Sequence, residues 1–349
     1  MEGCGKVLCK ETLGDNVKET EYAVRGPILD VAAEVTELLK KGEKLPFDKL
    51  LYCNIGNPLS LGQPSISFYR EVVSVALNPK LMDSPEISKD AKDRAKKFLE
   101  EVKYPSAIGA YTSSPGLLSV RQSVINYIQE RDGYPSDVNK IFLTDGASDG
   151  IKSIFNILVR GPQDGIMIPI PQYPLYTALI RLLNGTAVPY YLDEDKEWGL
   201  DMKDLEENCN KAKADGKTIR AMVVINPGNP TGQLMSVETL QEIIKFCQKH
   251  KIIILADEVY QKNIYKDKPF VSFKKVINDM GKPYSEMELI SFHSTSKGVS
   301  GECGLRGGYM ELTNIDEYVF SQLLKIRSIC LCSNVVGQLI VLVLNNCID

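Results

Sequence analysis

The sequence predicts an α/β fold with a doubly wound, mainly parallel sheet in one large domain and a second, smaller domain. From about residue 141, short β-rich runs alternate with longer helical patterns, which is typical of β-α-β units. Polar or glycine-rich clusters follow several of these runs, and open α/β sheets bind ligands beyond the carboxyl ends of their strands. A chain of 349 residues is long enough for both domains.

The expected strands and helices alternate along the chain. The strand-like runs are IFLT (141–144), IMIPI (166–170), AVPYYL (187–192), AMVVI (221–225), IIILA (252–256) and LISFH (289–293). One helical pattern ends near Leu158, a second covers 174–184, and a third starts near Asp201. A fourth covers 237–250, where Ser236 and Glu238 form a typical helix start. Before the alternation, the charged stretch 88–103 indicates a surface helix.

Composition favours a small-molecule partner. The 41 basic and 45 acidic residues nearly balance, and no basic block indicates binding to nucleic acid or an anionic membrane. The nine cysteines form no CxxC pair, which argues against a zinc site or any other metal centre and against a disulfide framework. Glu2, Glu11 and Asp15 lie where a secretory signal or mitochondrial presequence would be apolar or basic, so a cytoplasmic location is expected. The apolar run 338–344 is too short to span a bilayer.

Five clusters follow the strand-like runs and are expected to meet in one crevice. They are DGAS (145–148), PQYP (171–174), NPGNPTG (226–232), DEVY (257–260) and STSK (294–297). Lys297 in the last cluster offers an amine that can form an imine with an aldehyde, although an ordinary exposed lysine is the alternative. Ser294, Ser296 and Arg306 together suit a phosphate dianion, although a plain turn and a surface ion pair would also explain them.

The other clusters offer partners for a flat, charged ring. Asp257 leaves an apolar run and therefore needs a cation or several donors, such as a protonated pyridine nitrogen, unless it caps a helix. Tyr260 can reach a ring oxygen or belong to the core. Asn229 can point its amide at a ligand from a loop that prolines make rigid. Tyr173 can stack on the ring or serve a turn.

A second candidate anion site lies in DGAS. Ala147 and Ser148 come where a helical pattern begins, and the first N–H groups of a helix attract anions. A helix start without a ligand explains these residues equally well.

These motifs, in this order, resemble those of the pyridoxal-phosphate aminotransferases of fold type I. More narrowly, the chain resembles the alanine aminotransferase family, in YAVRGPI (22–28), IGAYTSS (108–114), IPIPQYPLY (168–176), LADEVYQ (255–261), SFHSTSKG (291–298) and GECG followed by RGGYME. The resemblance implies fold type I with pyridoxal 5'-phosphate as cofactor. It also implies an N-terminal arm and part of a small domain in 1–104, a large cofactor domain in 105–330 and an interdomain segment from 331 to 349.

The resemblance also implies a role for each matching residue. Lys297 would hold the cofactor as an internal aldimine and move the substrate's Cα proton, and Asp257 would keep the pyridine nitrogen protonated. Asn229 and Tyr260 would bond the ring oxygen, and Tyr173 would stack on the ring. The remaining assignments are Ala147, Ser148, Ser294 and Arg306 for the phosphate, Tyr111 for the phosphate of a partner subunit in a homodimer, and Gly56 for the passage of the substrate carboxylate.

The implied reaction is L-alanine + 2-oxoglutarate = pyruvate + L-glutamate. The alternatives are another fold type I activity, such as a lyase or decarboxylase, and a truncated, catalytically weak isoform that binds the cofactor and dimerises with full-length subunits. Departures from the family pattern are Pro115, Val299, Ser300 and SNVVG (333–337). Family members also continue for over a hundred residues past this sequence, with an arginine that grips the substrate carboxylate.

Overall fold

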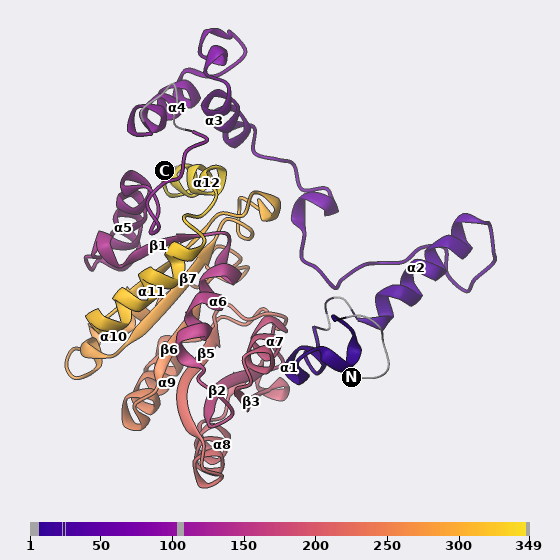
Figure 1. Cartoon of the computed structure of the whole chain (residues 1–349), viewed down its shortest axis with the longest axis vertical. Coiled ribbons are helices and arrows are strands. Elements are labelled where there is room, and N and C mark those ends of the chain that lie inside the picture. The colour runs from indigo at the N-terminus through magenta and orange to yellow at the C-terminus, as the bar shows by residue number, and fades with distance from the viewer. Residues whose placement is uncertain (1–6, 23, 25, 103–107, 347–349) are drawn as a thin grey trace.

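The computed structural model describes residues 7–22, 24, 26–102 and 108–346. Its ribbon is drawn in Figure 1. The α-helices are α1 Asp15–Lys18, α2 Pro27–Lys40, α3 Ser67–Leu77, α4 Lys89–Glu101, α5 Leu118–Asp132, α6 Ala147–Leu158, α7 Leu175–Leu182, α8 Met202–Ala214, α9 Val237–His250, α10 Phe273–Asp279, α11 Glu317–Ile329 and α12 Val335–Asn346. None of these described helices is long and apolar enough to cross a membrane.

The described residues form one eight-stranded sheet in the order β1-β8-β7-β6-β5-β2-β3-β4. The strands are β1 Ile141–Thr144, β2 Asp164–Ile170, β3 Thr186–Asp193, β4 Gly199–Leu200, β5 Thr218–Ile225, β6 Ile253–Asp257, β7 Leu289–Ser294 and β8 Gly308–Thr313. Five adjacent strands run parallel to one another, in the order β7, β6, β5, β2 and β3. Strand β8 is antiparallel to both β7 and β1, and β4 is antiparallel to β3. The mainly parallel sheet confirms the predicted fold class.

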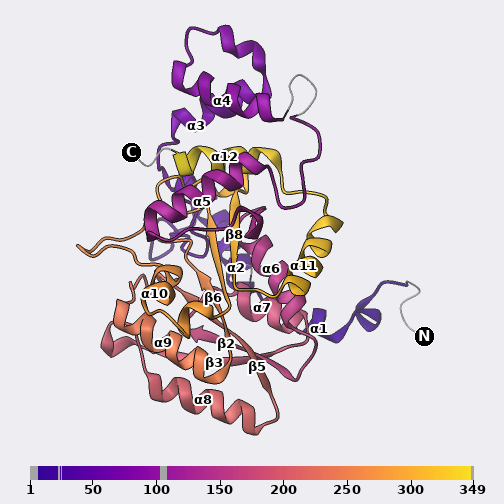
Figure 2. The same cartoon turned by 90° about the vertical axis from the view of Figure 1, so that its left-hand side faces the viewer.

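Helices cover both faces of the sheet (Figure 2). One face carries Ala221 and Val223 of β5 in a core with α6, α7 and α11, and the other carries Met222 and Val224 in a core with α8, α9 and α10. Because both faces are covered, successive residues of β5 are buried on opposite sides, which explains the uninterrupted apolar run AMVVI.

A third core lies at the β1 edge of the sheet. There α3, α4, α5 and α12 bury apolar side chains together with Ile141, Leu143 and Tyr309. This core includes residues from each of the three predicted segments 1–104, 105–330 and 331–349, and those boundaries stay a prediction. The apolar run 338–344 lies within α12.

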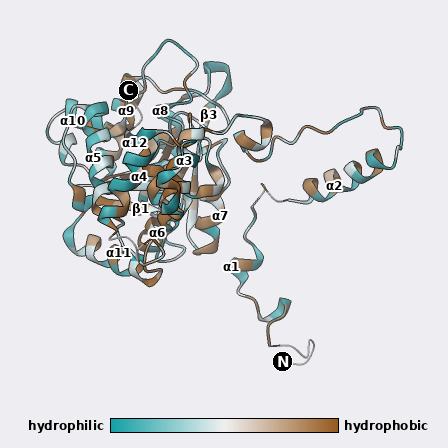
Figure 3. Ribbon diagram, turned by 90° about the horizontal axis from the view of Figure 1, so that it is seen from above, coloured by the Kyte–Doolittle hydropathy of each residue, from teal (hydrophilic) through white to brown (hydrophobic). Residues whose placement is uncertain are grey.

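The N-terminal segment extends away from the sheet (Figure 3). Helix α2 buries none of its residues, and Ile28 and Val31 are largely exposed. The chain then returns through η3 (Pro58–Leu61) to α3 beside the body of the protein. This return matters for function because it brings residues 56–70 to the carboxyl edge of the sheet.

The six predicted strands are confirmed as β1, β2, β3, β5, β6 and β7. Ser236 caps α9 by accepting a hydrogen bond from the Thr239 N–H, and α9 has the predicted bounds. The predicted surface helix is α4, capped by Ser88, and it is amphipathic because Phe98 and Leu99 are buried. Strands β4 and β8 are not among the predicted strands.

Candidate functional site

The site forms where the polar clusters leave the carboxyl ends of neighbouring strands. DEVY begins with the last residue of β6, STSK begins with the last residue of β7, NPGNPTG follows β5, and PQYP follows β2. The fifth cluster, DGAS, connects β1 to the start of α6. Strand β1 is antiparallel to β8, which is itself antiparallel to β7, so β1 ends at the same edge as β7. The predicted convergence is therefore observed.

Lys297 lies in a loop three residues after the end of β7. Its Nζ donates a hydrogen bond of 2.7 Å to the carbonyl oxygen of Gly56 and lies 5.9 Å from the centre of the Tyr260 ring. A side chain at Gly56 would place its Cβ 3.1 Å from the same Nζ, so glycine leaves space around the amine. Lys297 thus points across the crevice toward the N-terminal segment.

Asp257 is the buried carboxylate of the site. Tyr176 in α7 donates to its Oδ2 at 2.5 Å, and the Val259 N–H donates to its Oδ1 at 3.3 Å. Burial raises the pKa of Asp257 above its usual value, and these two hydrogen bonds only partly oppose that shift. A cation at this carboxylate would therefore be strongly stabilised. Sequence reasoning misses Tyr176, although a second tyrosine three residues after Tyr173 is the signal that the sequence offers.

Asn229 and Tyr260 lie in direct contact, and their predicted role at a ring oxygen stays a prediction. The Asn229 Nδ2 donates to the Tyr260 hydroxyl at 3.1 Å, and both residues line a cavity of about 260 Å³ together with Asn263 and Tyr265. Burial first, and then the negative charge of Asp257, raise the pKa of Tyr260 to about 12. Tyr260 is therefore neutral at physiological pH, and its hydroxyl, which accepts from Asn229, still has a proton to donate.

A compact cationic corner lies beside Lys297. The Arg306 Nη2 donates to the Ser148 Oγ at 3.2 Å and to the Asp145 carbonyl at 2.8 Å, at the start of α6. Gly146 has φ of +79°, and a Cβ there would lie only 2.3 Å from the same Nη2. The helix therefore begins at Ala147, against the guanidinium, where its free N–H groups add to the positive potential.

Two buried serines extend this corner from the end of β7. The Ser294 hydroxyl donates to the Ser296 hydroxyl at 2.9 Å and lies 3.2 Å from the Gly307 carbonyl oxygen. Gly307 directly follows Arg306 in the chain, so the serines lie against the backbone segment that carries the arginine. Helix N–H groups, hydroxyls and a guanidinium fork are together a donor set that suits a phosphate.

Tyr173 lies at the site's edge, where its hydroxyl shares a hydrogen bond of 2.7 Å with that of Tyr22. The two rings meet edge to face, with 6.4 Å between their centres. Tyr111 is exposed and is not joined by a hydrogen bond to these groups in the part of the chain that the structure describes. Its assignment to a partner subunit stays a prediction. Ala23 and Arg25 of the YAVRGPI motif lie outside the described residues.

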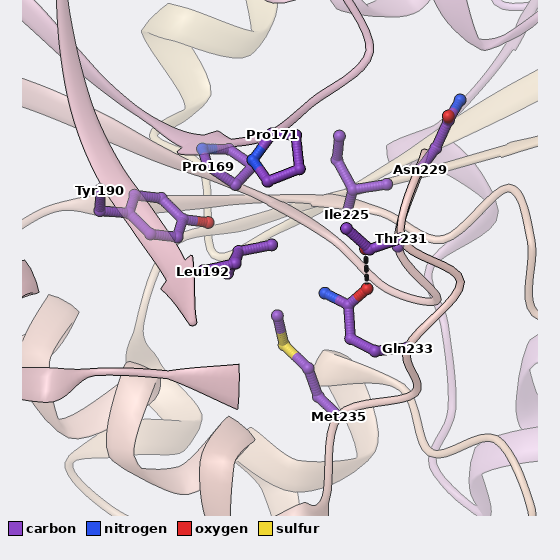
Figure 4. A pocket seen from close by; sticks show the side chains of 10 residues that line it. Pro169, Pro171, Tyr190, Leu192, Ile225, Asn229, Thr231, Gln233 and Met235 are labelled. Carbon is purple, nitrogen blue, oxygen red and sulfur yellow. Dashed lines mark hydrogen bonds between the residues drawn. The ribbon is translucent and has the colours of Figure 1, made fainter. Parts of the chain in front are cut away.

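A second, much smaller cavity lies under the Asn229 loop (Figure 4). Its volume is about 10 Å³, enough for roughly one water molecule. Pro169, Pro171 and Tyr190 line one side, and Gln233, hydrogen-bonded to Thr231, lies opposite. It is a gap in loop packing and is too small to hold a substrate.

The family model for "Aminotransferase class I and II" matches residues 76–348. The chain belongs to the class I and II aminotransferases. It is 49% identical over 340 residues to glutamate–glyoxylate aminotransferase 1 of Arabidopsis thaliana, covering 96% of this chain and 69% of the relative. It is 45% identical over 341 residues to alanine aminotransferase 1 of Bos taurus, covering 96% of this chain and 68% of the relative. The chain thus spans about two thirds of the length of these relatives.

Solved structures agree on the aminotransferase fold. An aminotransferase from Escherichia coli superposes with a TM-score of 0.75 at 28% identity, covering 96% of this chain and 71% of the other. Alanine aminotransferase from Pyrococcus furiosus gives the same TM-score at 24% identity, covering 96% and 72% of the two chains. The fold is therefore that of the fold type I enzymes, as the sequence predicts.

Class I and II aminotransferases are enzymes that use pyridoxal phosphate, and the site suits this group. The cofactor has an aldehyde, a pyridine nitrogen, a phenolic oxygen and a phosphate. The site offers one group for each of these: the Lys297 amine for the aldehyde, the buried Asp257 carboxylate for the nitrogen, the Asn229–Tyr260 pair for the phenolic oxygen and the Arg306 corner for the phosphate. The complementary groups are the ones that the sequence predicts, with Tyr176 added.

Proposed function

We propose that this aminotransferase moves the amino group of L-alanine to 2-oxoglutarate, giving pyruvate and L-glutamate, at a site built around Lys297. The observation that carries the proposal is the position of the Lys297 amine. It lies between Gly56 of the N-terminal segment and the Tyr260 ring, at the edge where Asp257 and Arg306 also emerge. The names of relatives at 45% to 47% identity, alanine aminotransferases of Bos taurus and Arabidopsis thaliana, support the choice of substrates.

In this proposal each side chain of the site has a defined role. When bound, the cofactor supplies an electron sink for the charge that develops at the substrate's Cα. Lys297 attaches the cofactor and, once released, takes and returns the Cα proton. Asp257, held by Tyr176, keeps a proton on the pyridine nitrogen. Asn229 and Tyr260 donate to the ring oxygen, and Tyr173 stacks on the ring.

The phosphate contacts complete the assignment. Ala147, Ser148, Ser294, Ser296 and Arg306 would bind the phosphate, and Gly56 would pass the substrate carboxylate. We further propose a homodimer, in which Tyr111 reaches the phosphate bound by the partner subunit, and a cytoplasmic location. The large exposure of Tyr111 and of α2 supports the dimer, since both present side chains that this chain does not cover.

A second candidate reaction is transfer from L-glutamate to glyoxylate, because two relatives at 49% identity are named glutamate–glyoxylate aminotransferases. The test is to give the cofactor-loaded chain each donor with each acceptor and to identify the products by mass spectrometry. Pyruvate and glutamate from alanine and 2-oxoglutarate would support the first reaction. Activity with glutamate and glyoxylate alone would select the second, and release of carbon dioxide would indicate a decarboxylase.

Lys297→Ala tests the site itself. Borohydride reduction of the wild-type complex should place the cofactor on the peptide that contains Lys297, and the variant should show no label and no visible band of lysine-bound cofactor. A label on another lysine in the wild-type protein would refute the assignment. Lys262→Ala is the matched control, because this lysine lies beside Gly298, the residue after Lys297, while its own Nζ lies over the Tyr127 ring.

A further inference from the structure

The loop that follows Lys297 combines an unusual backbone conformation with hydrogen bonds of its own. Gly298 and Gly301 both have positive φ, +65° and +59°, which only glycine adopts without strain. Within the loop, the Gly301 N–H reaches the Lys297 carbonyl at 3.4 Å, and the Ser300 hydroxyl and the Glu302 N–H donate to the Thr295 carbonyl at 2.5 and 2.9 Å. None of these bonds involves the Lys297 side chain, so the position of its amine depends on contacts with other parts of the chain.

Three of its anchors come from residues 56–70. Gly56 accepts from Lys297, and the Gln63 Nε2 donates to the Val299 carbonyl at 3.1 Å. Arg70 in α3 then forms a two-pronged ion pair with Glu302, in which one bond, from Nη2 to Oε2, measures 3.1 Å. The segment thus contacts the loop at its beginning, middle and end.

Glu302 is the unusual member of this set. Its side chain is 2% exposed, whereas that of Arg70 is 40% exposed, so the carboxylate is buried and its cation comes from the surface side. A buried carboxylate that loses its cation is strongly destabilised, whereas a loop that needs only shape could use an apolar residue or an amide. Glu302 therefore makes the position of this loop depend on α3.

We propose that Arg70 is a positioning residue for Lys297: from α3 it holds the buried Glu302 and so fixes the loop that carries the lysine amine. The inference rests on the proposed function of Lys297. The part of the inference that concerns structure, namely that α3 holds the loop through Arg70 and Glu302, does not depend on the cofactor. Substrate-induced or spontaneous movement of residues 56–70 would move Gly56, Gln63 and Arg70 together and would release the lysine loop.

The first experiment measures amide hydrogen exchange in the cofactor-free chain. Arg70→Met should speed exchange in residues 298–303 by about 10-fold, the lower limit for losing a hydrogen bond to a charged group. Arg160→Met is the matched control, because Arg160 forms a similar two-pronged pair with Asp164, with side chains 58% and 0% exposed, at the opposite end of the sheet. Equal exchange of residues 298–303 in the two variants would overturn the clamp.

The second experiment uses the cofactor-loaded chain and a signature of the lysine bond. Arg70→Met should weaken pyridoxal phosphate binding by about 10-fold and shift the pH midpoint of the visible band of lysine-bound cofactor. Arg70→Lys should restore most of both, since it returns the charge without the planar fork. Faster exchange with an unchanged affinity and pH midpoint would overturn the positioning role.

Glu302→Gln keeps the test decisive if Arg70→Met does not fold. This change keeps the shape and removes the charge, so it should speed exchange in the same residues by at least about threefold. Exchange as slow as in the wild-type chain would overturn the proposal. If the wild-type chain itself is not labelled at Lys297 after borohydride, the proposed function fails, while the exchange comparison still decides whether α3 holds the loop.

Discussion

Removing the hydroxyl of Tyr176 tests whether this residue serves a charged Asp257. In Tyr176→Phe the ring stays in its fully buried position, and only the 2.5 Å hydrogen bond to the Asp257 Oδ2 is lost. A hydrogen bond contributes about 1.5 to 3 kcal/mol with a charged partner and about 0.5 to 1.5 kcal/mol with a neutral one. The difference, about 1 to 1.5 kcal/mol, corresponds to a rise of about one unit in the pKa of Asp257. Asp257 is buried, so solvent does not screen this effect appreciably.

The sign of the pH dependence follows from linkage. Burial already raises the pKa of folded Asp257 above 3.8, so the folded chain holds an extra proton and loses stability as pH rises from about 3.8 through the folded pKa. Tyr176→Phe raises that pKa further and extends the loss. The destabilisation by the variant should therefore be about 0.5 to 1.5 kcal/mol below pH 4, as for a neutral partner, and grow by about 1 to 1.5 kcal/mol as the pH rises through the folded pKa of Asp257.

The assay is urea unfolding of the cofactor-free chain between pH 3.5 and 8, with midpoints compared at equal slope. Tyr190→Phe is the matched control, because Tyr190 is equally buried and donates at 2.7 Å to the neutral carbonyl of Val223. Its loss should be about 0.5 to 1.5 kcal/mol at every pH. If the losses in the two variants are parallel across the pH range, Tyr176 is not bonded to a charged carboxylate and the reasoning is wrong.

Three further predictions concern neighbouring positions. Gly146→Ala should weaken pyridoxal phosphate binding about 10-fold or more, because the added Cβ displaces the Arg306 guanidinium. Gly133→Ala is the control, because Gly133 has the same φ of +79° but a Cβ there would have no atom within 4 Å. It should leave the affinity unchanged in the same titration. Asp257→Asn should keep most of the cofactor affinity but slow the single-turnover reaction with alanine; normal turnover with lost binding would make Asp257 structural. Burial, partly opposed by Arg131, raises the pKa of Glu258 to about 7, so its contribution to stability falls as pH rises from about 4.5 to 7. Glu258→Gln should remove this fall, which amounts to about 3 kcal/mol in the free energy of unfolding measured with urea. An unchanged pH dependence in the variant would contradict the assignment.

Much of the fold follows from local patterns that the sequence displays. The parallel strands are buried on both faces and appear as continuous apolar runs, such as AMVVI in β5, and the Ser236 cap marks the start of α9. Strand β8 is harder to predict because its run GYMELT contains a glycine and a glutamate. Glu311 is nevertheless buried there, since Lys274 from α10 donates to it at 2.6 Å. A long-range ion pair of this kind leaves no local periodicity in the sequence.

The residues of the candidate site likewise include some that the sequence predicts and some that it does not. Asp257 ends β6, Asn229 and Lys297 follow β5 and β7, and Arg306 comes nine residues after Lys297. Motif and topology together therefore predict that they meet. Tyr176 and Arg70 lie inside helices, where their residue types alone indicate a core position and a surface charge. Their role appears only when the partner is known: a carboxylate 81 residues away for Tyr176 and one 232 residues away for Arg70. Such pairs depend on tertiary packing, which single-sequence patterns do not encode.

The antiparallel strand β8 has a consequence for how the site assembles during folding. Because β7 and β8 are neighbours in both sequence and sheet, Ser294, Lys297 and Arg306 belong to one hairpin that can pair without waiting for a distant strand. Asp257 ends β6 and Asn229 follows β5, and these strands join the sheet only through helical crossovers, which form more slowly. The segments that carry the lysine and the anion-binding arginine should therefore lie side by side before the carboxylate at the other end of the cofactor ring joins them, and the lysine amine takes its final position when residues 56–70 dock.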